Sequence, residues 1–121
     1  MVDPSLLVGL GAAVGALLRH GTGSVVATRL GDRDLPYGTF TVNVVGSFVL
    51  GLVAFSGAGT SVQFLVGTGA CGAYTTFSSF SVETVQLWEA GRRLLAGWYA
   101  AVNLGGAFAA LGLARILVGS V

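Results

Sequence analysis

The feature that most constrains this chain is the length of its apolar segments. Four of them follow one another, at residues 6–27, 37–55, 62–90 and 95–118, and most of the charged residues lie between them or at their ends. A helix needs about 20 mostly apolar residues to cross a bilayer. The sequence therefore predicts an all-α membrane protein, with residues 1–121 forming a single domain of four transmembrane helices.

The composition excludes several classes of protein. The 121 residues are 54% hydrophobic and only 9% charged, whereas a soluble domain carries roughly 25% charged residues. The net charge of +1 gives no reason to expect a nucleic-acid partner. One histidine, one cysteine and no pair of acids that we expect to be buried within a helix leave nothing from which to build a catalytic triad or a side-chain metal site, so we expect no enzyme.

The sequence GAYTTFSSFS, residues 72–81, places five hydroxyl side chains inside the third apolar segment. Such hydroxyls bond back to the carbonyl four residues earlier and loosen a helix, and Gly72 adds conformational freedom. We therefore expect a break near the middle of the third helix. Broken helices are tolerated at membrane depth only when they are buried in protein or line a hydrated cavity. The alternative is an unbroken helix whose Ser/Thr face packs on a partner.

A break of this kind exposes backbone groups of two chemical types. Freed carbonyls are hard oxygen ligands that suit a hard cation, whereas freed amides and hydroxyls are donors that suit a small anion. Phe77 and Phe80 are three residues apart and share a helix face. Their ring edges are slightly positive, and a weak contact with an anion suits a pore in which an ion must bind and also leave.

Other polar residues also fall at helical spacing. Thr39, Asn43 and Ser47 share one face of the second helix, and Asn43 offers two donors and an acceptor. Asn43 makes either a pore contact or one interhelical hydrogen bond. On the fourth helix, Tyr99 lies four residues before Asn103 and is either an interfacial anchor or directed inward.

Arg19 and the glycines complete the features of the predicted helices. Arg19 lies well inside the first helix, where it either extends to the interface or forms an electropositive vestibule that attracts anions. Gly11 and Gly15 form a GxxxG pair that predicts close helix packing. We expect the same of a group on the fourth helix: Gly105, Gly106 and Gly112.

Three motifs carry a family resemblance that covers nearly the whole chain. They are GAAVGALLRH in the first helix, PYGTFTVNVVGSFVLG in the second and GACGAYTTFSSFSVE in the third. With the four-helix layout, they resemble the small fluoride channels of the Fluc (CrcB) family. The resemblance implies an antiparallel, dual-topology dimer in the plasma membrane, with two pathways through which cytoplasmic fluoride is exported passively, lowering its toxicity.

The resemblance also implies roles for individual residues. The fluoride pathway would include Asn43, Phe77, Phe80, Ser79, Tyr99 and Arg19. The backbone carbonyls of Gly72 and Thr75 would hold a structural sodium ion at the dimer interface. The chain departs from the family pattern on the fourth helix, where NLGGAF supplies Asn103 and then glycines in place of the frequent serines and threonines.

The arginines bear on the orientation of the subunit. Arg29, Arg33, Arg92 and Arg93 lie in two loops on one side of the predicted bundle, whereas Arg115 lies near the opposite side. The positive-inside rule places those two loops in the cytoplasm. The dimer is then either a homodimer or a heterodimer with an oppositely oriented paralogue.

Two other functions remain as alternatives to a channel. A small four-helix multidrug exporter needs a membrane-embedded carboxylate in its first helix, where this chain has Arg19 and no acid. A non-transporting membrane scaffold would explain the glycines, but it leaves Asn43 and the paired phenylalanines without a role.

Overall fold

The computed structural model describes residues 2–31 and 35–120, and the elements in these ranges are all helical. Three of the helices are long: α1 Pro4–Leu30, α2 Tyr37–Phe55 and α6 Arg93–Gly119. The chain between α2 and α6 is divided into shorter pieces. These are α3 Thr60–Val62, the π-helix η1 Gln63–Cys71, α4 Gly72–Tyr74 and α5 Phe77–Glu89.

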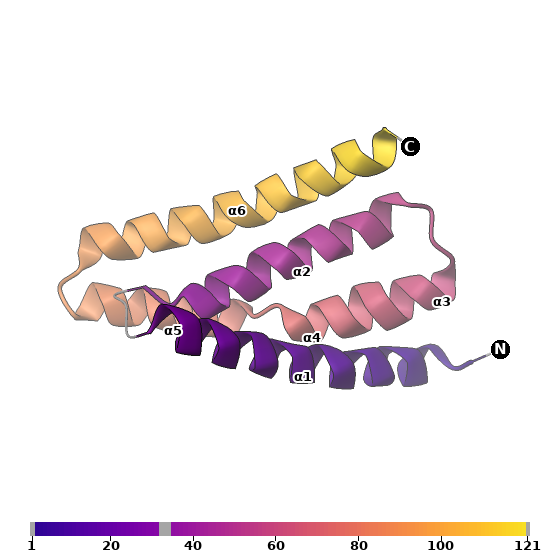
Figure 1. Cartoon of the computed structure of the whole chain (residues 1–121), viewed down its shortest axis with the longest axis horizontal. Helices are drawn as coiled ribbons and strands as arrows, with labels where there is room; N and C mark the ends of the chain where they lie inside the picture. The colour runs from indigo at the N-terminus through magenta and orange to yellow at the C-terminus, as the bar shows by residue number, and fades with distance from the viewer. Residues whose placement is uncertain (1, 32–34, 121) are drawn as a thin grey trace.

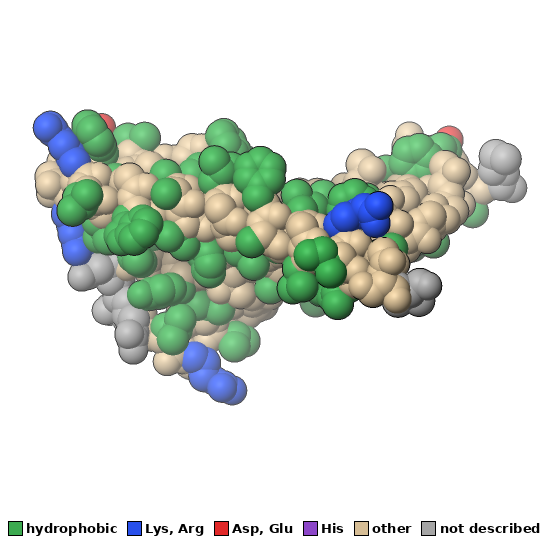
Figure 2. All heavy atoms as spheres, turned by 90° about the horizontal axis from the view of Figure 1, so that it is seen from above, with side chains coloured by type: hydrophobic (Ala, Val, Ile, Leu, Met, Phe, Trp, Pro, Cys, Tyr) green, Lys and Arg blue, Asp and Glu red, His purple; other side chains and the backbone are tan. Residues whose placement is uncertain are grey.

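The outer surface of the molecule is apolar. The three long helices have the length and hydropathy needed to cross a membrane. Figure 2 shows hydrophobic side chains along the whole visible face, with charged side chains in only a few places. Leu17 is 74% exposed and Leu94 is 89% exposed. Because so large an apolar surface is unfavourable in water, the structure confirms the prediction of an all-α membrane protein.

The helices lie side by side, with α1 packed mainly against η1 and α2 mainly against α6 (Figure 1). Both termini lie at one end of the bundle, and the turn between α5 and α6 lies at the other, beside the end of α1. Gly91, with φ of 82°, makes this turn. Arg29, Arg92 and Arg93 therefore gather at one end of the bundle, as expected from the sequence. Arg33 lies outside the described residues.

Small residues allow α1 and η1 to pack with their backbones in contact. A Cβ atom at Gly11 would collide with the carbonyl of Leu65, and one at Gly15 with the carbonyl of Ala70. This confirms the close packing predicted from the GxxxG pair.

The glycines of α6 behave differently from one another. Gly106 packs against the ring of Phe40, whereas a Cβ atom at Gly105 or Gly112 would meet nothing within 4 Å. Within one chain, the packing predicted for these three glycines therefore holds for Gly106 alone.

The break predicted near the middle of the third helical segment, within residues 72–81, is confirmed. The backbone leaves the helix at Thr75 (φ −80°, ψ 160°) and Thr76 (φ −147°, ψ 115°) and resumes it at Phe77. Gly72 keeps helical angles (φ −60°, ψ −38°), so its conformational freedom does not cause the break. The cause is a set of hydrogen bonds from a neighbouring helix.

The backbone contact between α1 and η1 gives a first prediction. Gly15→Ala should destabilise the protein by about 1–3 kcal/mol, because the added methyl group overpacks against the Ala70 carbonyl. Gly21→Ala is the matched control, since its Cβ atom would meet nothing within 4 Å. Unfolding by SDS in mixed micelles, followed by circular dichroism, measures both. Equal stability of the two variants would contradict the close contact.

Candidate functional site

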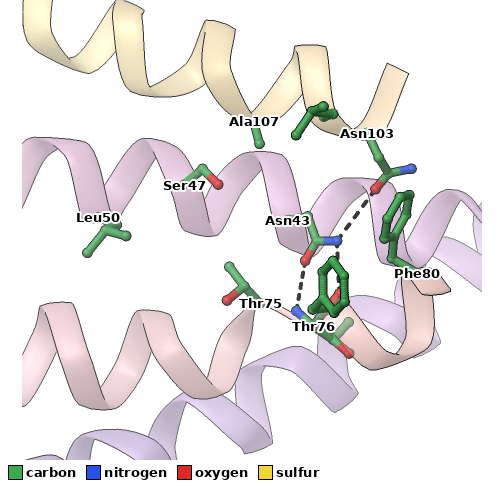
Figure 3. Close-up of a pocket in the computed structure, with 10 residues that line it drawn as sticks. Asn43, Ser47, Leu50, Thr75, Thr76, Phe80, Asn103 and Ala107 are labelled. Carbon is green, nitrogen blue, oxygen red and sulfur yellow. Dashed lines mark hydrogen bonds between the residues drawn. The ribbon is translucent and has the colours of Figure 1, made fainter. Parts of the chain in front are cut away.

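Asn43 holds the broken segment through both ends of its side-chain amide. Its Oδ1 accepts a hydrogen bond of 2.8 Å from the Thr76 backbone N–H, and its Nδ2 donates one of 3.1 Å to the Thr76 carbonyl. Figure 3 shows Asn43 extending from α2 to this point. The side chain thus pairs with the extended backbone of Thr76 as a neighbouring strand would, which satisfies a buried donor and acceptor at the break.

Thr76 also begins the next helix. Its Oγ1 accepts a bond of 3.1 Å from the Ser79 N–H and donates one of 3.0 Å to the Ser79 hydroxyl, so Thr76 is the N-cap of α5. The amino end of a helix carries a partial positive charge and unpaired backbone amides, and both favour a nearby anion.

The same bonds free two backbone carbonyls. In an unbroken α-helix the Gly72 carbonyl would pair with the N–H of Thr76, and the Thr75 carbonyl with the N–H of Ser79. The first of these amides donates to Asn43 and the second to the Thr76 hydroxyl. The break therefore presents carbonyl oxygens on its α4 side and amide donors on its α5 side.

A cavity of about 250 Å³ lies beside the break, between α2, α5 and α6 (Figure 3). It is lined by Asn43, Ser47, Leu50, Thr75, Thr76, Phe77, Phe80, Asn103, Leu104 and Ala107. The two phenylalanine rings are tilted with their centroids 5.9 Å apart, and Phe77 is 79% exposed. The structure thus brings together three of the predicted pathway residues: Asn43, Phe77 and Phe80.

The other predicted residues lie in different places. Ser79 is joined to this site through Thr76, and Thr75 lines the cavity. Gly72 is exposed just before the break. Arg19 is exposed on α1 and does not line this cavity.

Tyr99 is buried, and its ring lies 5.8 Å from that of Phe80. Its hydroxyl donates a hydrogen bond of 2.6 Å to Glu83 Oε2. Of the two alternatives for Tyr99, the structure therefore shows the inward orientation.

Glu83 is a residue that the sequence analysis did not place in the site. Its carboxylate accepts a hydrogen bond of 2.9 Å from Thr39 as well as the bond from Tyr99, so it joins α2, α5 and α6. It also lines a second cavity of about 280 Å³ near the end of α1. Glu83 follows Phe80 by three residues on α5, and this spacing was a signal in the sequence that the two side chains share a face.

Asn103 connects α6 to the break. It is 4% exposed, its Nδ2 donates to the Tyr99 carbonyl at 3.2 Å, and its Oδ1 lies 3.5 Å from Asn43 Nδ2 (Figure 3). Asn43 therefore directs one N–H at Thr76 and the other toward Asn103 across the cavity.

The pairing of Asn43 with Thr76 gives a second prediction. Asn43→Leu should lower the free energy of unfolding by about 1–3 kcal/mol, because buried backbone groups of Thr76 lose their partners. Ser47→Ala, one turn further along α2 and lining the same cavity, should change it by less than about 0.5 kcal/mol. The SDS titration measures both, and equal losses would show that Asn43 does not hold the break.

Comparisons with known proteins agree with one another. Residues 6–115 match the family model described as CrcB-like protein, Camphor Resistance (CrcB). The chain is 52% identical over 113 residues to "Fluoride-specific ion channel FluC 2" of Haloarcula marismortui, covering 93% of this chain and 92% of that protein. It is 47% identical over 118 residues to "Fluoride-specific ion channel FluC 1" of Halobacterium salinarum, covering 98% and 96%. The chain therefore belongs to the CrcB family.

Proposed function

We propose that the chain forms a passive, fluoride-selective ion channel of the plasma membrane, which lets cytoplasmic fluoride leave the cell and so lowers its toxicity. The observation that carries this proposal is full-length similarity to relatives named fluoride-specific ion channels, combined with a donor-bearing cavity at a break inside an apolar bundle. The channel family is not a class of enzymes. A multidrug exporter is not favoured, because the described residues of α1 contain no acid.

In the proposed topology the chain crosses the membrane four times. The third crossing consists of α3, η1, α4 and α5 in succession, interrupted at Thr75 and Thr76. This arrangement places both termini on one side, which agrees with their position at one end of the bundle (Figure 1).

Along the proposed pathway, hydrogen-bond donors of the protein replace the water molecules that hydrate fluoride. Arg19 raises the local anion concentration at the entrance. Fluoride then meets amide and hydroxyl donors of Asn43 and Ser79 near the amino end of α5, the ring edges of Phe77 and Phe80, and finally Tyr99. Fluoride is the smallest halide, so closely spaced donors replace its hydration shell more completely than they replace that of chloride.

A second subunit is part of the proposal. Phe77 lines the cavity and is nevertheless 79% exposed, so one chain alone leaves its ring uncovered. The open faces at Gly105 and Gly112 would permit close approach of another helix. An antiparallel partner would then close the pathway at the exposed rings, giving a dimer with two pathways.

We also propose a structural sodium ion at the dimer interface, held by the carbonyls of Gly72 and Thr75. The fit rests on the diversion of the two amides that would otherwise pair with these carbonyls. Carbonyl oxygens are ligands suited to a hard cation. When bound, sodium would offset the negative ends of these carbonyl dipoles. Replacing sodium by a large organic cation on both sides should slow fluoride flow, and unchanged flow would exclude this role.

The channel proposal gives a third prediction. Liposomes containing the purified protein should release fluoride while they retain chloride. Phe77→Ile and Phe80→Ile should slow the release by roughly tenfold, which corresponds to about 1.4 kcal/mol of lost contact at the barrier. Phe55→Ile, at the far end of α2, is the control and should leave the rate unchanged. A fluoride electrode measures the release. Unchanged rates in both pathway variants would remove the role of the rings, and equal release of both halides would contradict selectivity.

A fourth prediction concerns orientation. Because Arg29, Arg92 and Arg93 gather at one end, that end should face the cytoplasm and the C-terminus should lie outside. A C-terminal alkaline phosphatase fusion should then be active and a C-terminal green fluorescent protein fusion dim. This result favours pairing with an oppositely oriented paralogue. Comparable signals from both fusions, with the chain expressed alone, would instead indicate a homodimer of chains inserted both ways.

A further inference from the structure

The donor that Asn43 offers to the cavity already has a weak partner. One of its two Nδ2 hydrogens is used by the Thr76 carbonyl at 3.1 Å. The other is directed at Asn103 Oδ1, at 3.5 Å. That distance exceeds the roughly 2.7–3.2 Å typical of N–H···O bonds, so the second contact is much the weaker of the two.

Asn103 is held so that its oxygen points at Asn43. Its Nδ2 donates to the Tyr99 carbonyl one turn earlier on α6, which directs its Oδ1 toward α2. The residue is 4% exposed and lines the same cavity as Phe77 and Phe80 (Figure 3). An acceptor therefore stands fixed beside the cavity donor, whereas a serine or threonine hydroxyl could rotate to donate.

We propose that Asn103 Oδ1 competes with the permeant anion for the second Nδ2–H of Asn43, and so determines how weakly the cavity holds that anion. This proposal rests on the proposed fluoride channel and deepens it. When the cavity contains no anion, the N–H stays on Asn103; when fluoride arrives, it takes the N–H and Asn103 loses that contact. The internal competitor lowers affinity and speeds departure, which a pore requires.

The proposal makes Asn103 a positioning residue whose replacement should strengthen fluoride binding. Asn103→Leu removes the acceptor and keeps the same number and branching of side-chain heavy atoms, so fluoride should bind more tightly and leave more slowly. The apparent dissociation constant for fluoride should fall by about twofold, as expected for the loss of a competing hydrogen bond at the weak end of the usual range. A residue that only supports the fold would have the opposite effect, because its loss damages the binding site.

The sequence makes a direct test practical. Asn43 and Asn103 are its only asparagines, so ¹⁵N-asparagine labelling gives two side-chain NH₂ signals in the full-length protein, and Asn103→Leu leaves that of Asn43 alone. Without fluoride, the Asn43 proton should move upfield in the variant as its acceptor disappears. Titration with sodium fluoride should move it downfield in both proteins, at about twofold lower concentration in the variant.

Further variants and an independent assay separate this proposal from the channel proposal. Asn103→Ala should act in the same direction as Asn103→Leu. Gln63→Leu is the control, because it removes a hydrogen bond of 2.9 Å from a side-chain amide to the Val53 carbonyl, away from the cavity, and it should leave the fluoride affinity unchanged. Liposome efflux is measured on the same proteins. If the wild type conducts fluoride and the affinity of both Asn103 variants is unchanged or weaker, the competition is refuted while the channel stands. If the wild type conducts no fluoride, the channel proposal itself fails.

Discussion

The paired hydrogen bonds between the Asn43 amide and the Thr76 backbone are the interaction on which the rest of the site depends. They take the Thr76 N–H away from Gly72 and hold the chain extended for two residues. Thr76 can then cap α5, and that cap takes the Ser79 amide away from Thr75. One side chain from α2 thus turns a continuous helix into two half-helices, without leaving the amide and carbonyl of Thr76 unpaired inside an apolar bundle.

The break also separates opposite polarities along one segment. The carbonyl end of α4 and the amide end of α5 face each other across two residues. The same short segment can therefore contact a cation through carbonyl oxygens and an anion through amides and ring edges. The Glu83 carboxylate, bonded to Thr39 and Tyr99, fixes α5 against α2 and α6, so the rings on α5 have a defined position beside the cavity.

The sequence predicted the apolar helices, the GxxxG contact and the existence of the break, because each follows from local composition or helical spacing. The cause of the break, by contrast, is a contact from outside the segment. Gly72 was expected to add conformational freedom, whereas the bond from Asn43 determines that the chain unwinds at Thr75 and Thr76. The Glu83 network was missed for the same reason, since it joins three helices that are distant in sequence. The contact between Asn103 and Asn43 likewise depends on how α6 lies against α2, which spacing alone does not determine.

The central claim is that this donor-lined break conducts fluoride and excludes other halides. The most direct measurement is the reversal potential of the purified protein in a planar bilayer, with equal concentrations of fluoride on one side and chloride on the other. The account predicts a current carried from the fluoride side alone, and hence a reversal potential far from zero with the sign set by fluoride. A measurable current that reverses near zero would show that both halides pass equally well, and would contradict the account.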